Sequence, residues 1–327
     1  MAGAPPAGCS KTPERVDTKN PGKTSSTLPD FFYGMIYKIE HSLTYEFSAP
    51  VFLEPHRIYL KPRTDNSQRL LDFELSIDPK PSFISQNTDA CGNPETRVWF
   101  QGLSRFLSVR AVSQVETVRT NPFDFLIDPG SMSLPVRYEP SVLGPLQPYH
   151  RKKRFPPDIL AFASGFAKEA RGDTLTFLIN LTQTLSRTFR KIRREDGEAW
   201  PAAKTLLMRT GACRDLSVLF MACCTVQGIA SRFVSGYYDG EESPHFRKEL
   251  HSWVEVYLEG GGWRGYDPMN GIAAFDRHTA LMAAPSAAQT APVQGKFRGD
   301  NIVSQLRFNV SVLPDTSAVP FFQQQQQ

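Results

Sequence analysis

The first part of the chain alternates hydrophobic and polar residues over short stretches, a pattern typical of strands that bury one face. Between Ile36 and Val118 these stretches are separated by Pro, Gly, Asn and Asp, which favour turns. They are Ile36–Phe47, Arg57–Leu60, Leu71–Ile77, Thr96–Phe100 and Leu107–Val118. The connection Asp89–Pro94 is rich in turn residues and suits a hairpin loop. We therefore predict a small antiparallel β domain over residues 31–126.

From residue 156 the hydrophobic residues recur with helical spacing instead. Asp158–Ala170 places its apolar residues on one face, and Asp173 suits the N-cap of a second amphipathic helix. The segment Cys213–Gln227 is apolar on nearly all sides and stops at Gly228. We expect a buried central helix there, with a cysteine as its first residue.

The chain after this helix again alternates in the manner of strands. The predicted strands are Ser231–Tyr238, Ser252–Leu258, Trp263–Tyr266 and Leu306–Val312. Helices come first and antiparallel strands follow, so we predict an α+β domain over residues 156–313.

The remaining segments lack periodicity. Residues 127–155 are rich in proline and predict a surface connector between the two domains. Residues 1–30 consist largely of small and polar residues, and residues 314–327 end in five glutamines. We expect a disordered leader and a disordered tail at these ends, because neither could bury a face.

Composition narrows the function classes that fit the chain. Lys and Arg number 37 against 33 Asp and Glu, a formal net charge of +4 over 327 residues. That excess is too small to indicate a surface that binds nucleic acid. No stretch reaches the roughly 18 consecutive apolar residues of a membrane span, and residues 1–30 lack the apolar segment of a secretory signal. We expect a cytoplasmic protein with neither nucleic acid nor membrane as a partner.

The cysteines do not form a recognisable disulfide or zinc pattern. They are odd in number, scattered, and contain no Cys-x-x-Cys pair. The five are Cys9, Cys91, Cys213, Cys223 and Cys224. We expect free thiols, no bound metal and no cofactor, with Cys223 and Cys224 in the core.

Cys213 stands where a thiol becomes reactive. At a helix N-terminus, the unpaired backbone N–H groups and the positive end of the helix dipole favour the thiolate, which lowers the thiol pKa. The preceding Thr210–Ala212 contains a glycine turn into the helix. The backbone N–H of Cys213 itself would also point at an oxyanion forming beside the sulfur. Cys213 is therefore the candidate nucleophile.

Two further residues complete a catalytic arrangement. His251 opens one predicted strand, and Asp267 follows the next, beyond the turn Glu259–Gly262. Adjacent strands joined by that turn would place His251 beside Asp267. The imidazole could then activate the thiol, while the carboxylate holds the imidazole in orientation. The pattern predicts a Cys213, His251 and Asp267 triad of the kind that thiol acyl-transfer enzymes use.

Four sequence blocks surround these residues, in the order Gly211–Asp215, Gly228–Tyr237, His251–Val256 and Gly262–Pro268. Together they resemble the bacterial transglutaminase-like superfamily. The resemblance continues upstream over Tyr37–Phe125, and downstream through His278 and Ala291–Gly295. It implies a papain-like or transglutaminase-like α+β catalytic core preceded by a small antiparallel β domain. It also implies that Cys213, His251 and Asp267 act as nucleophile, base and orienting acid on a peptide or amide bond.

Other residues near these blocks are weaker candidates for a functional role. Trp200 is a weak candidate for a second oxyanion donor, and Met269 changes the wall beside Asp267. We interpret Arg214 and Asp215 as structural, since they complement the helix dipole. His245 is either a substrate contact or part of a solvated acidic loop. The remaining histidines, which we expect to be structural or on the surface, are His41, His56, His150 and His278.

Three functions remain open from the sequence. The first is a cysteine hydrolase that attacks a peptide or amide carbonyl and releases the acyl group to water. The second is a transglutaminase, in which an amine takes the acyl group from the same thioester. The third is a catalytically silent module that binds peptides. In each case the expected partner is a peptide or protein.

Overall fold

The computed structural model describes residues 34–150, 154–194, 197–240 and 250–315. The expected leader (1–30), nearly all of the expected tail, Cys9 and His245 lie outside these ranges. Within the described residues, no helix combines the length and hydrophobicity needed to cross a membrane. The cytoplasmic location stays a prediction.

The N-terminal region consists of two antiparallel sheets. The larger sheet contains β15 (Phe297–Arg298), β1 (Ile36–Leu53), β6 (Leu103–Thr117) and β3 (Gln68–Asp78) in that order, with β16 (Ser304–Pro314) also paired to β1. The smaller sheet contains β14 (Val293–Gln294), β2 (His56–Ile58), β5 (Pro94–Trp99) and β4 (Phe83–Thr88). Residues from both ends of the chain therefore build this region.

All five strands predicted here are present, but two features differ from the sequence analysis. Strand β4 was not predicted, because five of its six residues are exposed and hydrophobic alternation needs a buried face. The predicted strand Leu306–Val312 exists as β16, yet it pairs with β1 from Tyr37↔Pro314 to Phe47↔Ser304. Placing it in the sheet of domain 156–313 was therefore wrong.

The second region joins helices to a five-stranded antiparallel sheet. Its main helices are α3 (Pro157–Glu169), α4 (Thr174–Thr188), α5 (Ala202–Met208) and α6 (Cys213–Val226). The sheet order is β12 (Ile272–Ala274), β11 (Gly262–Asp267), β10 (His251–Leu258), β9 (Ser231–Tyr238) and β13 (His278–Ala284). Shorter elements are α1 (Pro129–Met132), α2 (Pro140–Leu146), β7 (Arg190–Lys191), β8 (Thr210–Gly211) and a 3-10 turn at Ala287–Gln289. The fold is α+β, as predicted.

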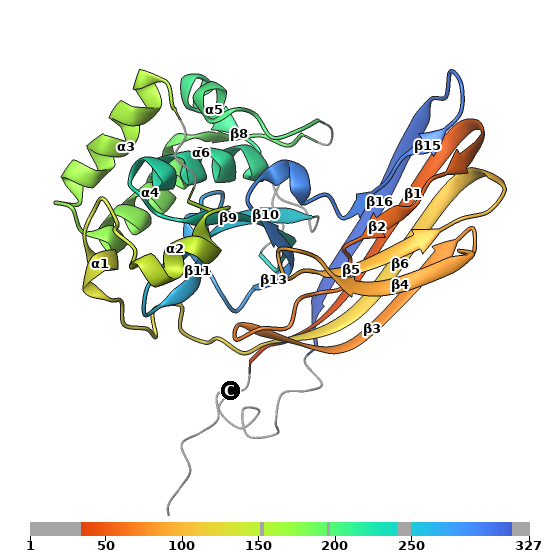
Figure 1. Ribbon diagram of the computed structural model, residues 1–327, viewed down its shortest axis with the longest axis horizontal. Coiled ribbons are helices and arrows are strands. Elements are labelled where there is room, and N and C mark those ends of the chain that lie inside the picture. Colours follow the sequence, from red (N-terminus) through yellow and green to blue (C-terminus); the bar gives the residue numbers. More distant parts are fainter. Residues whose placement is uncertain (1–33, 151–153, 195–196, 241–249, 316–327) are drawn as a thin grey trace, which may run out of the picture. The chain divides into compact units, whose positions relative to one another are not determined.

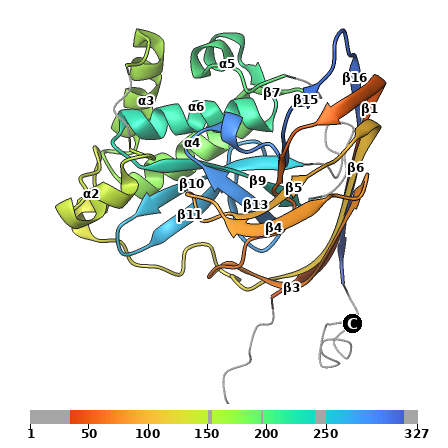
Figure 2. The ribbon, with the colours of Figure 1, turned by 45° about the vertical axis from the view of Figure 1, so that its right-hand side comes forward.

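The central helix α6 is buried because apolar residues cover most of its surface. Leu216, Leu219 and Phe220 are fully buried and share a core with Val254 and Val256 of strand β10. Strand residues alternate between faces, so Trp253 of the same strand points to a separate cluster on the opposite side of the sheet. The helices thus lie on one side of the sheet, as Figures 1 and 2 show.

The N-terminal region packs against the other side of this sheet. The free edge of β13 is paired by two amide side chains: Gln68 bonds both backbone groups of Ala280, and Asn93 bonds both backbone groups of Ala283, at 2.7–2.9 Å. Each side-chain amide pairs with a backbone N–H and a backbone C=O of β13, as a neighbouring strand would, so these edge groups are not left unpaired. A buried ion pair, Arg63 to Glu255 at 2.7 Å, crosses the same interface. The two regions are therefore fixed against each other.

Candidate active site

Cys213 is the first residue of α6, and a buried carboxylate holds this end of the helix. Asp215, which is fully buried, accepts a hydrogen bond from the Ala212 backbone N–H at 2.9 Å. Its other oxygen accepts from the Arg194 guanidinium and from the Trp200 backbone N–H, both at 2.8 Å. Asp215 therefore ties the segment around residues 194–200 to the helix end that carries the thiol. This agrees with the structural role expected for Asp215.

Trp200 does not reach the thiol as a second oxyanion donor would. Its backbone N–H is taken by Asp215. Its indole ring lies between the Arg194 guanidinium, 4.5 Å from the ring centre, and the Lys204 ammonium, 4.1 Å away. Trp200 lines neither of the two cavities beside Cys213. Its contacts place it as a support for the segment, and the oxyanion interpretation was wrong.

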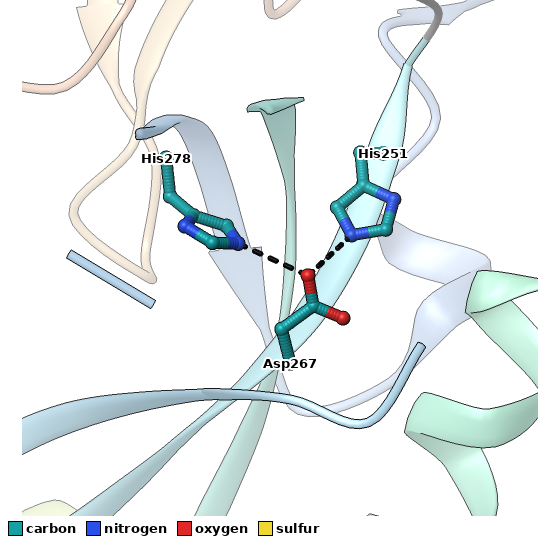
Figure 3. Close-up of side chains that lie close together, drawn as sticks. All are labelled: His251, Asp267 and His278. Atoms are coloured by element: carbon teal, nitrogen blue, oxygen red, sulfur yellow. Dashed lines mark hydrogen bonds and ion pairs between the residues drawn. The ribbon is translucent and has the colours of Figure 1, made fainter. Parts of the chain in front are cut away.

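His251 and Asp267 meet as the strand pairing predicts. Strands β10 and β11 are antiparallel neighbours, and His251 Nε2 lies 2.8 Å from Asp267 Oδ2 (Figure 3). Both side chains are buried, with 4% and 0% of their surface exposed. Because Nε2 contacts the carboxylate, Nδ1 is the ring nitrogen left for the Cys213 thiol, to which His251 is hydrogen-bonded.

This contact changes the proton affinity of both partners. Burial raises the pKa of Cys213, but the hydrogen bond and positive charge of His251 outweigh burial and hold that pKa below its usual value. Burial lowers the pKa of His251, while the Asp267 carboxylate and the thiolate raise it further than burial lowers it. The site therefore favours a thiolate beside an imidazolium, the reactive form of a cysteine nucleophile.

Asp267 is stabilised as a carboxylate by several donors. Burial raises its pKa, yet the charge and hydrogen bond of His251 and the hydrogen bond of His278 lower it strongly. The backbone N–H groups of Met269 and Asn270 donate to Oδ1 at 2.9 and 3.1 Å, and the Asn270 amide donates to Oδ2 at 2.7 Å. Met269 therefore contacts Asp267 through its backbone, which is independent of side-chain identity.

His278 is the site residue that the sequence analysis missed. It opens strand β13, and its Nε2 lies 3.0 Å from Asp267 Oδ2, the same oxygen that His251 contacts (Figure 3). We expected a structural or surface residue, and its buried contact with the Asp267 carboxylate was not predicted. The strand it begins was not predicted, so no sequence spacing pointed from His278 to Asp267. The sheet topology brings the start of β13, which carries His278, and the start of β10, which carries His251, to Asp267 at the end of β11.

The environment of His278 keeps its imidazole neutral. Burial lowers its pKa, although Asp267 opposes this effect. Its Nδ1 is buried and has no hydrogen-bond partner among the described residues, while the rings of Tyr238 and Trp253 pack 4.5 and 5.1 Å from the imidazole. A neutral His278 that donates from Nε2 to Asp267 fits these contacts.

The same three side chains could also hold a metal ion. One ligand atom from each of His251, Asp267 and His278 lies within 4.8 Å of the other two. A metal would have to replace the protons that link both histidines to Asp267, at 2.8 and 3.0 Å. The donors around the carboxylate already satisfy it, so the geometry fits a hydrogen-bonded triad.

Cys213 lies between two cavities, each of about 370 Å³. Both are lined by Cys213, Arg214, Leu250 and His251. One extends toward the N-terminal sheet, and the other extends past the turn at Ala287–Gln289. The thiol can therefore face a substrate that continues on both sides of the bond under attack.

The other cysteines of the core have a different environment. Cys223 and Cys224 are fully buried in α6, and burial raises the pKa of both, to about 12 for Cys223. They fit the expected core thiols. Cys91, in the hairpin loop between β4 and β5, is a partly buried free thiol.

Comparison with known proteins agrees with this architecture. Residues 37–116 match the bacterial transglutaminase-like N-terminal region, and residues 166–268 match the transglutaminase-like superfamily. Uncharacterized proteins of Mycobacterium bovis and Mycobacterium tuberculosis are 24% identical over 290 residues, which cover 85% of this chain and 92% of theirs. The crystal structure of a candidate cysteine protease from Cytophaga hutchinsonii superposes with a TM-score of 0.65 at 20% identity, covering 88% of this chain and 93% of that protein.

The two matched regions correspond to the two parts of the fold. The N-terminal match spans strands β1 to β6, and the second match spans the segment from the end of α3 through Asp267. The Cytophaga structure supports the same fold across both. Residues 166–268 of this chain are therefore similar to the transglutaminase-like superfamily, and residues 37–116, ahead of them, are similar to the bacterial transglutaminase-like N-terminal region.

Proposed function

We propose that the protein is a cysteine hydrolase of peptide or amide bonds, in which Cys213 forms a thioester with the acyl part of the substrate. The observation that carries this proposal is the series of hydrogen bonds from Cys213 through His251 to Asp267. The match of residues 166–268 to the transglutaminase-like superfamily and the fold shared with a candidate cysteine protease are consistent with it.

In the first half of the reaction, the Cys213 thiolate attacks the carbonyl carbon. Negative charge then develops on the carbonyl oxygen beside the start of α6, where the Cys213 backbone N–H has no intrahelical acceptor and can donate to it. His251 transfers its Nδ1 proton to the departing nitrogen as the C–N bond breaks. The products are a free amine and a thioester on Cys213.

In the second half, water resolves the thioester. The now neutral His251 removes a proton from water, and the resulting hydroxide attacks the thioester carbonyl. The C–S bond breaks, the carboxylic acid leaves, and Cys213 returns to the thiolate beside protonated His251. Asp267 stabilises the imidazolium in both halves.

We assign His278 a positioning role in this reaction. Its Nε2–H donates to the oxygen of Asp267 that faces His251. The carboxylate is thereby held between two imidazoles, which limits its rotation and keeps it ionised. Because His278 does not contact Cys213 in any described interaction, it acts through Asp267.

Trapping the acyl-enzyme tests the proposal. A peptide pool would be mixed with the protein, quenched in acid and analysed by mass spectrometry, with Cys213→Ala as the control. We expect an added acyl mass on the peptide that contains Cys213, and free acids accumulating with turnover. Turnover by Cys213→Ala would contradict the mechanism. A product that carries added cadaverine as the major species would favour amine transfer and leave the thioester assignment intact.

A further inference from the structure

The N-terminal sheet forms one wall of a cavity that contains Cys213. Side chains of β1 and β16 line this cavity together with Cys213 and His251 of the catalytic core. The lining residues from the two strands are His41, Leu43, Tyr45, Leu306 and Phe308. Residues from opposite ends of the sequence therefore face the thiol from one sheet.

Strand register places four of these side chains in a single patch. Leu43 is directly opposite Phe308, and Tyr45 is directly opposite Leu306. Residues opposite each other in an antiparallel pair share one face of the sheet, with their side chains in contact range. The four form a continuous apolar surface, which we call the sheet patch.

The sheet patch changes from buried to exposed toward the cavity. Val310, on the same face of β16, is 9% exposed, whereas Phe308 is 39% exposed and Leu306 is 43% exposed. Large apolar side chains seldom stay exposed together on a protein surface unless they bind something. Here the exposed end of the patch borders the cavity of the candidate nucleophile.

The patch also keeps a fixed position relative to the thiol. His41, which precedes it on β1, is hydrogen-bonded through Nδ1 to the Tyr237 hydroxyl of β9 at 2.9 Å, in a buried contact. Tyr237 and Leu281 of the catalytic sheet belong to the same core cluster as Leu43. A wall held this way can select a substrate by shape, since it does not move aside when another group enters.

The second cavity beside Cys213 has a different lining. Ala287, Ala288, Thr290 and Ser235 line this cavity and not the first one, together with Phe233. It lacks the four side chains of the sheet patch, and Phe233 is its one large apolar lining residue that the first cavity does not share. The two sides of the nucleophile therefore select different groups.

We infer that the sheet patch is a specificity site, and that it binds an aromatic or branched aliphatic side chain of a peptide substrate next to the bond attacked. This inference rests on the proposed function, since it names the substrate class of the same site. It also gives the N-terminal region a role: it supplies part of the substrate site.

Binding to an inert protein tests the inference separately from catalysis. In the Cys213→Ala background, fluorescence anisotropy would measure the affinity of fluorescein-labelled oligoglycine peptides in which one position is Phe, Leu, Ala or Asp. We expect the Phe and Leu peptides to bind at least about tenfold more tightly than the Ala and Asp peptides, because each buries apolar area that Ala and Asp lack. Adding Phe308→Ala or Leu306→Ala should remove most of this difference.

Leu313→Ala is the matched control, because Leu313 is an exposed residue of the same strand, 55% exposed, and does not line the cavity. It should leave the preference unchanged. Equal binding of all four peptides, a preference that survives Phe308→Ala and Leu306→Ala, or dimerisation that Phe308→Ala abolishes would each overturn the inference. An apolar preference in a protein whose wild type never forms an acyl-enzyme would support the inference while refuting the proposed function.

Discussion

At the scale of single residues, the central claim is that Cys213 differs chemically from the other thiols of its own helix. His251 lowers the pKa of Cys213, whereas burial raises the pKa of Cys223 and Cys224. Iodoacetamide should therefore alkylate Cys213 much faster than either neighbour, since only thiolates react. Peptide mapping after brief labelling measures this. Equal labelling of the three cysteines would remove the basis for calling Cys213 the nucleophile.

The pH dependence of this alkylation follows from the direction in which the pKa of Cys213 is shifted. A lowered pKa keeps the thiolate populated below the usual thiol range near pH 8.5, so the rate should fall only as pH drops through the lowered value. In His251→Ala the hydrogen bond and charge that lower the pKa are gone. Burial, which raises the thiol pKa, remains, so the labelling rate of this variant should already decline as pH falls through the usual thiol range. Identical pH profiles for both proteins would show that His251 does not control the thiol.

His278 provides the third prediction at this scale. His278→Leu removes the donor to Asp267, and we expect kcat/KM to fall about tenfold, since a hydrogen bond to a charged group contributes about 1.5–3 kcal/mol. Glutamine can place an amide donor near the position of Nε2, so His278→Gln should recover most of the activity. Thermal melts of both variants serve as the control for folding. Equal losses for Leu and Gln, at equal stability, would argue against the donor role.

At the scale of elements, the start of α6 depends on a buried carboxylate that joins three segments. Asp215→Asn would leave the Arg194 charge without its partner, and removing one member of a buried pair costs about 3–5 kcal/mol. Because Arg194 is 18% exposed, we expect the free energy of unfolding to fall by about 2–4 kcal/mol. Urea unfolding measures this loss of stability. The rate at which iodoacetamide labels Cys213 should also fall, because the start of α6 becomes less ordered.

A cap on a neighbouring helix gives the control for that prediction. Asp173 caps α4 by accepting a hydrogen bond from the Thr176 backbone N–H at 2.7 Å. Asp173→Ala should reduce stability by about 1 kcal/mol and leave the labelling rate of Cys213 unchanged. If both variants changed the labelling rate equally, the effect of Asp215 would be global instability and not local positioning.

At the scale of the whole molecule, the ion pair between Arg63 and Glu255 that joins the two regions should matter because it is buried. Glu255 contacts Arg63 at 2.7 Å and also pairs with Arg232, and these arginines lower the pKa of Glu255 to about 2 against the effect of burial. Glu255→Gln removes the buried carboxylate from both cations and leaves Arg63 only the more exposed Asp65, 3.3 Å away. We expect it to reduce the free energy of unfolding by about 3–5 kcal/mol. Arg110→Ala breaks the exposed pair with Glu40, also 2.7 Å long, and should leave the free energy of unfolding nearly unchanged, because solvent screens this pair.

The lowered pKa of Glu255 also sets the pH range over which this residue stabilises the folded protein. A carboxyl whose pKa is lower in the folded protein stabilises it fully above its unfolded pKa of about 4.5. That contribution is lost as pH falls toward 2. Acid unfolding of the wild type should therefore show a stability loss between about pH 4.5 and 2 that Glu255→Gln lacks. Parallel stability curves for the two proteins over that range would contradict it.

Local signals in the sequence were enough for most elements and for the three residues proposed to react. Hydrophobic periodicity marks α6, and its first residue is Cys213. Alternation followed by a glycine turn marks β10 and β11, and that pairing alone brings His251 to Asp267. These relations depend on neighbouring segments, whose geometry a period of 3.6 or 2 fixes. Strand β4 was not predicted, because a strand with exposed residues on both faces shows no alternation of hydrophobic and polar residues.

The sequence by itself determined the α+β composition of the chain, the helix start at Cys213 and the strand pair that joins His251 to Asp267. Only the tertiary structure decided that β16 pairs with β1, that His278 reaches Asp267, and that Gln68 and Asn93 close the edge of β13. The physical reason is common to all three. Backbone hydrogen bonds are the same for every sequence, so a pattern that predicts a strand cannot name its distant partner. Which strands meet is settled when the two regions bury their apolar faces together, and that packing places the sheet patch beside Cys213.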